Sequence, residues 1–150
     1  MNLEQNKFVE RRQHQRFPIT IQLAEVVTIE SPQLPSGPHQ AILIDLSAGG
    51  MGLATVFPLP VGTVLNLNLN LKNLSLQNVS GKVVWSINRA GMHHQGISFE
   101  KIDAAAQKLL KAIAADYQEC EKKIAENKKA ICFAACHYYP FCFKKIKKNF

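Results

Sequence analysis

One stretch of this chain alternates apolar and polar residues so regularly that it is typical of a half-buried strand. Between Val64 and Leu71 the sequence reads VLNLNLNL. The leucines fall at every second position: Leu65, Leu67, Leu69 and Leu71. Successive side chains of a strand point to opposite faces, whereas a helix would spread these leucines around its circumference. The pattern predicts a strand with one face in a hydrophobic core and an asparagine-lined face in solvent.

Shorter apolar and β-branched runs, separated by turn-forming residues, predict further strands. The expected strands are 17–29, 40–46, 51–56, 64–71, 74–79, 82–87 and 94–99. The breaks are an exposed loop at Ser31–Pro38, which holds three prolines and a glycine, and turns at Ser80-Gly81 and Arg89-Ala90-Gly91. Six or seven short strands spaced about ten residues apart, with no helix between them, predict an antiparallel barrel or sandwich.

The period of the pattern changes at Asp103, which is a predicted helix N-cap. Beyond it, apolar residues recur at spacings of three and four and so share one helical face. They are Ala106, Leu109, Leu110, Ile113, Tyr117, Cys120 and Ile124. We therefore expect an amphipathic helix after the barrel, with pairing of two copies through Ile113, Tyr117 and Ile124 as a further possibility.

The positive charge is concentrated at the end of the chain. The formal net charge is +7, which by itself suggests a polyanionic partner. Residues 120–150 hold eight lysines and two glutamates, whereas residues 1–119 carry ten basic and nine acidic groups. Because the strand-forming region is nearly neutral, nucleic acid is not the favoured partner. A small basic nucleic-acid-binding barrel or a purely structural interaction barrel is kept as the alternative function.

Three segments are expected from composition: a leader of residues 1–16, a barrel and helix over 17–129, and a tail of 130–150. The leader is polar and charged, unlike a secretory signal, which predicts a cytoplasmic protein, with peripheral contact to the inner membrane as an option. The tail combines aromatic residues and cysteines with the basic cluster 144–148. Such a segment either lies on anionic lipid or an acidic partner, or packs back on the barrel or helix.

The tail also contains potential zinc ligands. They are Cys132, Cys136, His137 and Cys142. Structural zinc sites place close cysteine pairs on either side of a loop, and this single interleaved cluster does not, so the expectation is no metal. In a cytoplasmic protein the cysteines are expected to be reduced.

Two polar clusters lie where a barrel would bring them together. Glu10–Arg16 precedes the first predicted strand and places Arg12 and Arg16 four residues apart. Asp45-Leu-Ser47-Ala-Gly-Gly50 joins the end of one predicted strand to the start of the next. We find no paired carboxylates, no nucleophile beside a base and no Walker pattern, so we expect a binding protein and no enzyme.

Together the clusters resemble the signature of the PilZ family, Arg-x-x-x-Arg followed by Asp-x-Ser-x-x-Gly. The resemblance covers roughly residues 8–125, including the strand that ends in Gly96-Ile-Ser-Phe99. It implies a mainly β fold, a six-stranded antiparallel PilZ-like β-barrel followed by a C-terminal amphipathic α-helix. It also implies a bacterial receptor that binds cyclic di-GMP and relays the level of this second messenger to an unidentified protein partner, in control of motility, attachment, secretion or virulence.

The resemblance assigns the ligand to a small set of residues. They are Arg12, Arg16, Asp45, Ser47 and Gly50, with Gly49 and Arg11 as further candidates. Arginine suits this ligand because its planar fork can bond phosphate oxygens or the O6 and N7 edge of guanine, and can stack on a base. Ionised aspartate accepts N–H bonds from guanine, and serine can donate or accept.

The glycines and Arg11 carry more specific expectations. Gly49, Gly50 and Gly52 are expected to adopt positive φ and to let the ligand approach the turn. Arg11 would be either a third cationic contact or a solvated charge, which leaves open whether one or two ligand molecules bind.

Overall fold

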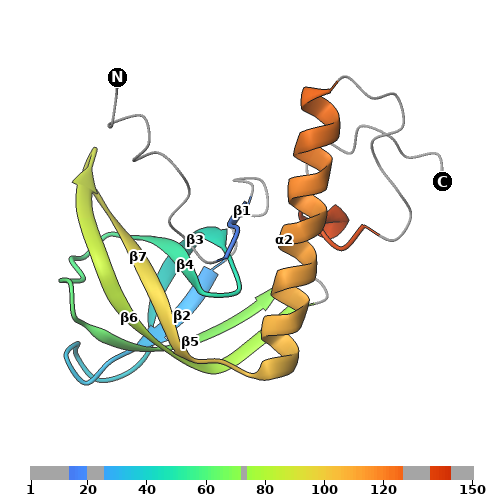
Figure 1. Cartoon of the computed structure of the whole chain (residues 1–150). Coiled ribbons are helices and arrows are strands. Elements are labelled where there is room, and N and C mark those ends of the chain that lie inside the picture. The colour runs from blue at the N-terminus through green and yellow to red at the C-terminus, as the bar shows by residue number, and fades with distance from the viewer. Residues whose placement is uncertain (1–13, 20–25, 72–73, 127–135, 143–150) are drawn as a thin grey trace, which may run out of the picture.

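The computed structural model describes residues 14–19, 26–71, 74–126 and 136–142. In these ranges, antiparallel strands form one curved sheet that closes into a barrel beside a long helix (Figure 1). The strands are β1 (Phe17–Pro18), β2 (Val26–Glu30), β3 (His39–Leu46), β4 (Gly50–Thr55), β5 (Val64–Leu71), β6 (Leu74–Arg89) and β7 (Met92–Lys101). Their order is β1-β3-β2-β5-β6-β7-β4. Because β3 also pairs with β4, six strands close the barrel and β1 is an additional strand, which confirms the predicted mainly β fold.

The alternating leucines of β5 line the barrel interior. Leu65, Leu67 and Leu69 are at most 2% exposed, and Leu71 is partly buried against the same core. The intervening Asn66 and Asn68 are only partly buried, and the side-chain amide of Asn68 donates to Asn66 Oδ1. The alternation along β5 therefore follows the predicted division between core and solvent.

Of the two turns predicted between the later strands, one is present and the other is not. Arg89-Ala90-Gly91 is a tight turn as expected, with φ of 54° at Ala90 and 84° at Gly91, the combination that a two-residue hairpin turn requires. Ser80-Gly81 is not a turn, and the two strands predicted on either side of it are the single strand β6. A Cβ on Gly81 would lie 2.7 Å from Ile97 Cγ2, so glycine here gives room for β7 where the register shifts.

The predicted strand 17–29 is also divided. Its described parts are β1 and β2, which pair with different positions of β3, and residues 20–25 lie outside the described ranges. The remaining predicted strands correspond to β3, β4, β5 and β7 within a few residues.

The predicted helix is α2 (Ala104–Ala125), and it begins where the sequence indicates. Asp103 Oδ2 accepts a hydrogen bond from the amide of Ala106 at 3.1 Å, as an N-cap does. Leu110 and Ile113 of its apolar face are buried in the barrel core. Among the described residues, no helix is long and apolar enough to cross a membrane.

Residues 136–142 pack back onto the body of the protein. This segment contains the short 3-10 helix η1 (Tyr139–Phe141), and Tyr138 and Phe141 are 5% and 2% exposed. The ring centroid of Tyr138 lies 4.9 Å from that of Tyr117, so this segment partly covers the helix face there, and pairing of two copies stays a prediction. Of the two alternatives for the tail, packing against the barrel and helix is therefore the one found for residues 136–142. The lysine cluster 144–148 lies outside the described residues, so its contact with a membrane stays a prediction.

This packing predicts a loss of stability at alkaline pH. Burial raises the pKa of Tyr138 far above its ordinary 10.0 and raises that of Cys136 above 9.0. Above about pH 9 the unfolded chain therefore releases protons that the folded chain retains, and the free energy of unfolding falls as pH rises. Urea denaturation at pH 7.5, 9 and 10 would measure the fall.

Tyr138→Phe is the matched control, because it keeps the buried ring and removes the ionisable hydroxyl. We expect the decline with pH to be shallower in this variant. An identical pH dependence in the two proteins would contradict the assignment to Tyr138.

Candidate ligand-binding site

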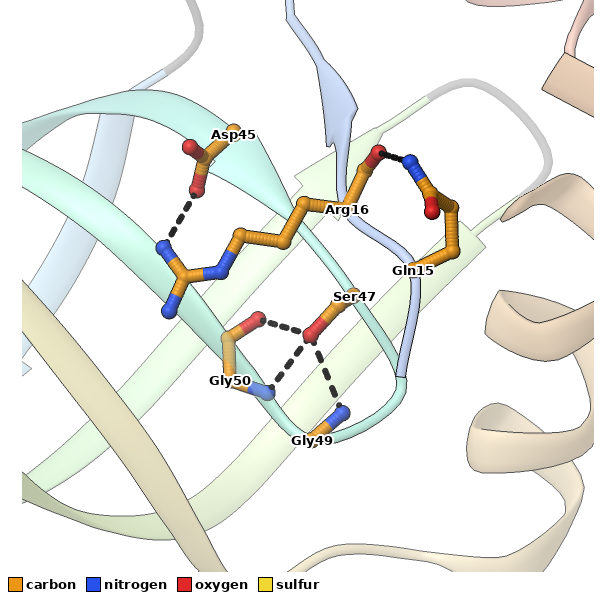
Figure 2. Close-up of polar contacts among 6 residues, drawn as sticks. All are labelled: Gln15, Arg16, Asp45, Ser47, Gly49 and Gly50. Carbon is orange, nitrogen blue, oxygen red and sulfur yellow. Dashed lines mark hydrogen bonds and ion pairs between the residues drawn. The ribbon is translucent and has the colours of Figure 1, made fainter. Parts of the chain in front are cut away.

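The hairpin between β3 and β4 is built around the hydroxyl of Ser47. Ser47 Oγ accepts hydrogen bonds from the amides of Gly49 and Gly50 at 3.1 and 3.0 Å, as Figure 2 shows. The Ser47 amide donates to the carbonyl of Gly50 at 2.9 Å. Ser47 is only 3% exposed, so its hydroxyl sets the shape of the turn from within, a common use of serine in turns.

The glycines of this turn are required for space, and the expectation of positive φ at Gly49, Gly50 and Gly52 was wrong. The glycines with positive φ are Gly37, Gly62 and Gly91, all elsewhere. A Cβ on Gly50 would collide with the carbonyl oxygen of Ile97 in β7, and one on Gly52 would lie 2.8 Å from Asp45 Oδ1. Close approach of neighbouring strands and side chains, rather than an unusual backbone conformation, therefore explains the glycines.

Arg16 reaches from the leader to the end of β3. β1 pairs with β3 so that Pro18 lies opposite Asp45. Arg16, two residues before Pro18, places its Nη1 3.2 Å from Asp45 Oδ1 (Figure 2). The side chains are 16% and 28% exposed, so the ion pair lies at the protein surface, partly covered.

The guanidinium of Arg16 has an unused donor. Its Nε is buried and has no hydrogen-bond partner among the described residues. A buried N–H without an acceptor is costly, and this cost favours an acceptor supplied by a water or a ligand. Arg16 can therefore donate a hydrogen bond to a further acceptor while it contacts Asp45.

A row of outward-facing positions runs from Asp45 across three further strands. Asp45 pairs with Gly52, Gly52 with Gly96, and Gly96 with Trp85. Paired residues of an antiparallel sheet point to the same face. A Cβ on Gly96 would collide with the indole of Trp85, so this ring, 40% exposed in total, lies over Gly96.

Trp85 is not among the predicted site residues, and nothing in its local sequence marks it as part of the site. Its relation to Asp45 depends on strand register, which brings β6 and β3 together through β4 and β7. A surface with a carboxylate over Gly52 and an indole over the neighbouring Gly96 offers a polar and an aromatic contact to one flat ligand.

A surface cleft of about 900 Å³ adjoins the same turn. It is bordered by His14 and Arg16, by the turn residues Ser47–Gly50, by the end of β7 and by Gln107 of α2. Gln107 Nε2 donates to the carbonyl of Ala48 at 3.0 Å and so joins the helix to the turn. Arg16 borders the cleft and contacts Asp45, so it lies between the cleft and the Asp45–Trp85 row.

The structure thus brings together Arg16, Asp45, Ser47, Gly49 and Gly50 of the predicted site. Arg11 and Arg12 lie outside the described residues, and their contacts to a ligand stay a prediction. His14 and Gln107 border the site but were not predicted, because only the folded chain places them beside the turn.

The zinc candidates do not form a metal site in the described part of the tail. Within these ranges, no group of three His, Cys, Asp or Glu side chains is close enough to hold a metal ion, and Cys132 is not described. Cys136 and Cys142 pack partly buried against the core. His137 Nδ1 lies 2.8 Å from Asp116 Oδ2.

Comparison with protein families identifies the class. The family model described as PilZ domain matches residues 10–116, which include both polar clusters, the barrel and the first half of α2. The match covers more than half of the chain, and the chain belongs to the PilZ domain family. A search of curated protein sequences finds no match.

Solved structures share the fold at low sequence identity. The PilZ domain with c-di-GMP of YcgR from Escherichia coli is 17% identical, with a TM-score of 0.56 over 79% of this chain and 99% of that one. The K. pneumonia MrkH–c-di-GMP complex is 19% identical, with a TM-score of 0.61 over 80% of this chain and 57% of that one. The Bacillus subtilis inhibitor of motility (MotI/DgrA) is 18% identical, with a TM-score of 0.57 over 81% of this chain and 55% of that one. This chain thus spans little more than half the length of the last two proteins.

The packing of the turn predicts that Gly50 tolerates no side chain. Gly50→Ala would force its methyl group into the backbone of β7, and we expect it to lower the free energy of unfolding by about 2 kcal/mol. Gly49→Ala is the matched control, since its methyl group would meet the side chain of His14, which can move more easily than backbone. Urea denaturation of both variants measures the difference, and equal effects would contradict the account of the turn.

Proposed function

We propose that this protein is a receptor for cyclic di-GMP that binds the dinucleotide and performs no chemistry on it. The binding groups are Arg12 and Arg16 of the leader and Asp45, Ser47 and Gly50 of the β3–β4 hairpin. The observation that carries the proposal is the position of Arg16, 3.2 Å from Asp45 and beside the glycine turn, with a buried Nε that has no acceptor in the described part of the chain.

The two side chains are chemically complementary to a guanine nucleotide diester. Arginine can donate two parallel hydrogen bonds to phosphate oxygens or to the O6 and N7 edge of guanine. The Asp45 carboxylate can accept from the N–H groups on the opposite, Watson–Crick edge of guanine. Ser47 shapes the turn, and the absence of a side chain at Gly50 keeps the turn compact.

Ligand binding in this proposal exchanges one ion pair for several hydrogen bonds. Without ligand, a single contact at the surface joins Arg16 and Asp45, and pairs of this kind contribute about 0–1 kcal/mol. A phosphate or guanine offers Arg16 a bidentate acceptor, and guanine offers Asp45 N–H donors. The exchange therefore costs little and provides stronger partners to both groups.

The solved PilZ structures of YcgR and MrkH with c-di-GMP support the choice of ligand. Membership of the same family supports it further. We propose that ligand binding fixes the leader over the barrel and so changes the surface that a protein partner reads, in control of motility, attachment, secretion or virulence.

Isothermal titration calorimetry with cyclic di-GMP tests the site. We expect a dissociation constant of about 1 µM or tighter, equivalent to roughly 8 kcal/mol. Arg16→Ala or Asp45→Ala should weaken binding at least tenfold, because each removes a charged partner of the ligand, a loss of about 1.5–3 kcal/mol.

Arg89→Ala serves as the control, since it removes an exposed arginine in the β6–β7 hairpin. A single-stranded oligonucleotide replaces the dinucleotide in a parallel titration. Unchanged affinity in the Arg16 and Asp45 variants would refute the assigned site, and preference for the oligonucleotide would favour the nucleic-acid-binding alternative.

Trp85, the single tryptophan of the chain, provides an optical test of where the ligand lies. A guanine held by Asp45 would extend over Gly96 toward the exposed indole, and stacking there should quench its fluorescence. We expect quenching that saturates with the calorimetric dissociation constant and that requires a correspondingly higher ligand concentration in Arg16→Ala. An unchanged emission spectrum during full calorimetric binding would contradict a guanine position over Gly96.

A further inference from the structure

The residues that hold Arg16 in place include a segment outside the family match. Residues 136–142, which we call the clasp, lie beyond the matched range 10–116. Yet Tyr138 and Phe141 of the clasp are buried against Phe17, the residue directly after Arg16. The ring centroid of Phe17 lies 5.8 Å from that of Tyr138 and 6.2 Å from that of Phe141. Phe17 is itself fully buried.

The strand that carries Arg16 to the site has few backbone bonds of its own. β1 has two residues, which pair with Asp45 and Leu46 at the end of β3, and directly after it the amide of Ile19 donates to the carbonyl of Ile44. Pro18 has no amide hydrogen to donate. Its carbonyl oxygen accepts a hydrogen bond from the hydroxyl of Tyr138 at 3.0 Å.

The clasp is in turn fixed to α2. The ring of Tyr138 contacts that of Tyr117, and the amide of His137 donates to Asp116 Oδ2 at 2.7 Å. β1 is therefore held between β3 on one side and a clasp anchored on the helix on the other. The position of Arg16 relative to Asp45 depends on both.

We propose that Tyr138 and Phe141 are positioning residues for the ligand-binding arginine, and that docking of the clasp and binding of cyclic di-GMP strengthen each other. This inference rests on the proposed function. With the clasp docked, β1 is held beside β3 and Arg16 faces Asp45. With the clasp undocked, β1 loses the contacts of Phe17, and a smaller fraction of the protein presents Arg16 correctly. The apparent affinity is reduced by that fraction, and linkage requires the ligand to favour the docked state by the same factor.

The first test is the affinity of the full chain for cyclic di-GMP. Phe141→Ala, which removes a ring against Phe17, should weaken binding about tenfold, within the range usual for coupled sites. Tyr138→Phe, which keeps the ring and removes only the hydrogen bond to Pro18, should weaken binding about threefold. Ile29→Val is the control, because it removes a buried methylene group in β2, opposite His39 at the other end of β3 from Asp45, and should leave affinity unchanged.

The second test reads the reverse effect, which a merely structural clasp would not show. Cys136 is partly buried in the clasp, so its rate of alkylation by iodoacetamide, followed by peptide mass spectrometry, reports undocking. Saturating cyclic di-GMP should slow this alkylation severalfold in the wild-type chain and leave it unchanged in Arg16→Ala.

The outcomes separate the two proposals. Folded clasp variants that bind with wild-type affinity would overturn the coupling and leave the receptor proposal intact. Equal alkylation rates with and without bound ligand would overturn it as well. Failure of the wild-type chain to bind cyclic di-GMP would overturn the proposed function and the coupling with it.

Discussion

The pairing of β3 along both of its edges is the constraint on which the site depends. β4 lies along one edge of β3 and closes the barrel there. On the opposite edge β2 pairs with the first half of β3, and β1 pairs with Asp45 and Leu46 at its end. Asp45 is thus held by a strand on each side, and its carboxylate is directed outward over Gly52. The strand pairing that closes the barrel therefore also fixes the position of the Asp45 carboxylate and brings Arg16 beside it.

The ion pair between Arg16 and Asp45 is suited to exchange because it is incomplete. A fully buried, well-satisfied pair would resist separation, since each lone charge would be left without solvent or partner. Here one Nη1–Oδ1 contact joins two partly exposed side chains, and Arg16 Nε has no partner in the described ranges. The pair holds the arginine beside the β3–β4 turn at little cost. A ligand that bonds both groups can then replace it without a large rearrangement.

The sequence predicted the parts of this structure that depend on local pattern. The alternation in β5, the Asp103 cap and the Ala90-Gly91 turn are properties of a few consecutive residues, and all three were confirmed. The two signature clusters also located Arg16 and Asp45 correctly beside one turn. The errors concern glycines whose role is set by distant residues. Gly81 was taken for a turn because nothing near it in sequence reveals Ile97, and Gly50 was assigned positive φ because its real constraint is the backbone of β7. Trp85 was missed as a neighbour of the site for the same reason, since strand register cannot be read from one strand.

The C-terminal clasp shows how a small barrel can extend its core and its site together. β1 is too short to be stable through backbone bonding alone, so its position depends on burial of Phe17. The barrel supplies one wall for Phe17, and residues roughly 120 positions further along the chain supply the other. In the coupling we propose, any change that alters the contact of the clasp with β1 therefore acts on Arg16 at the end of the leader, although no clasp residue borders the cleft. Burial of one aromatic ring thereby connects residues 136–142 to an ion pair near the other end of the sequence, which is the physical basis of the coupling we propose.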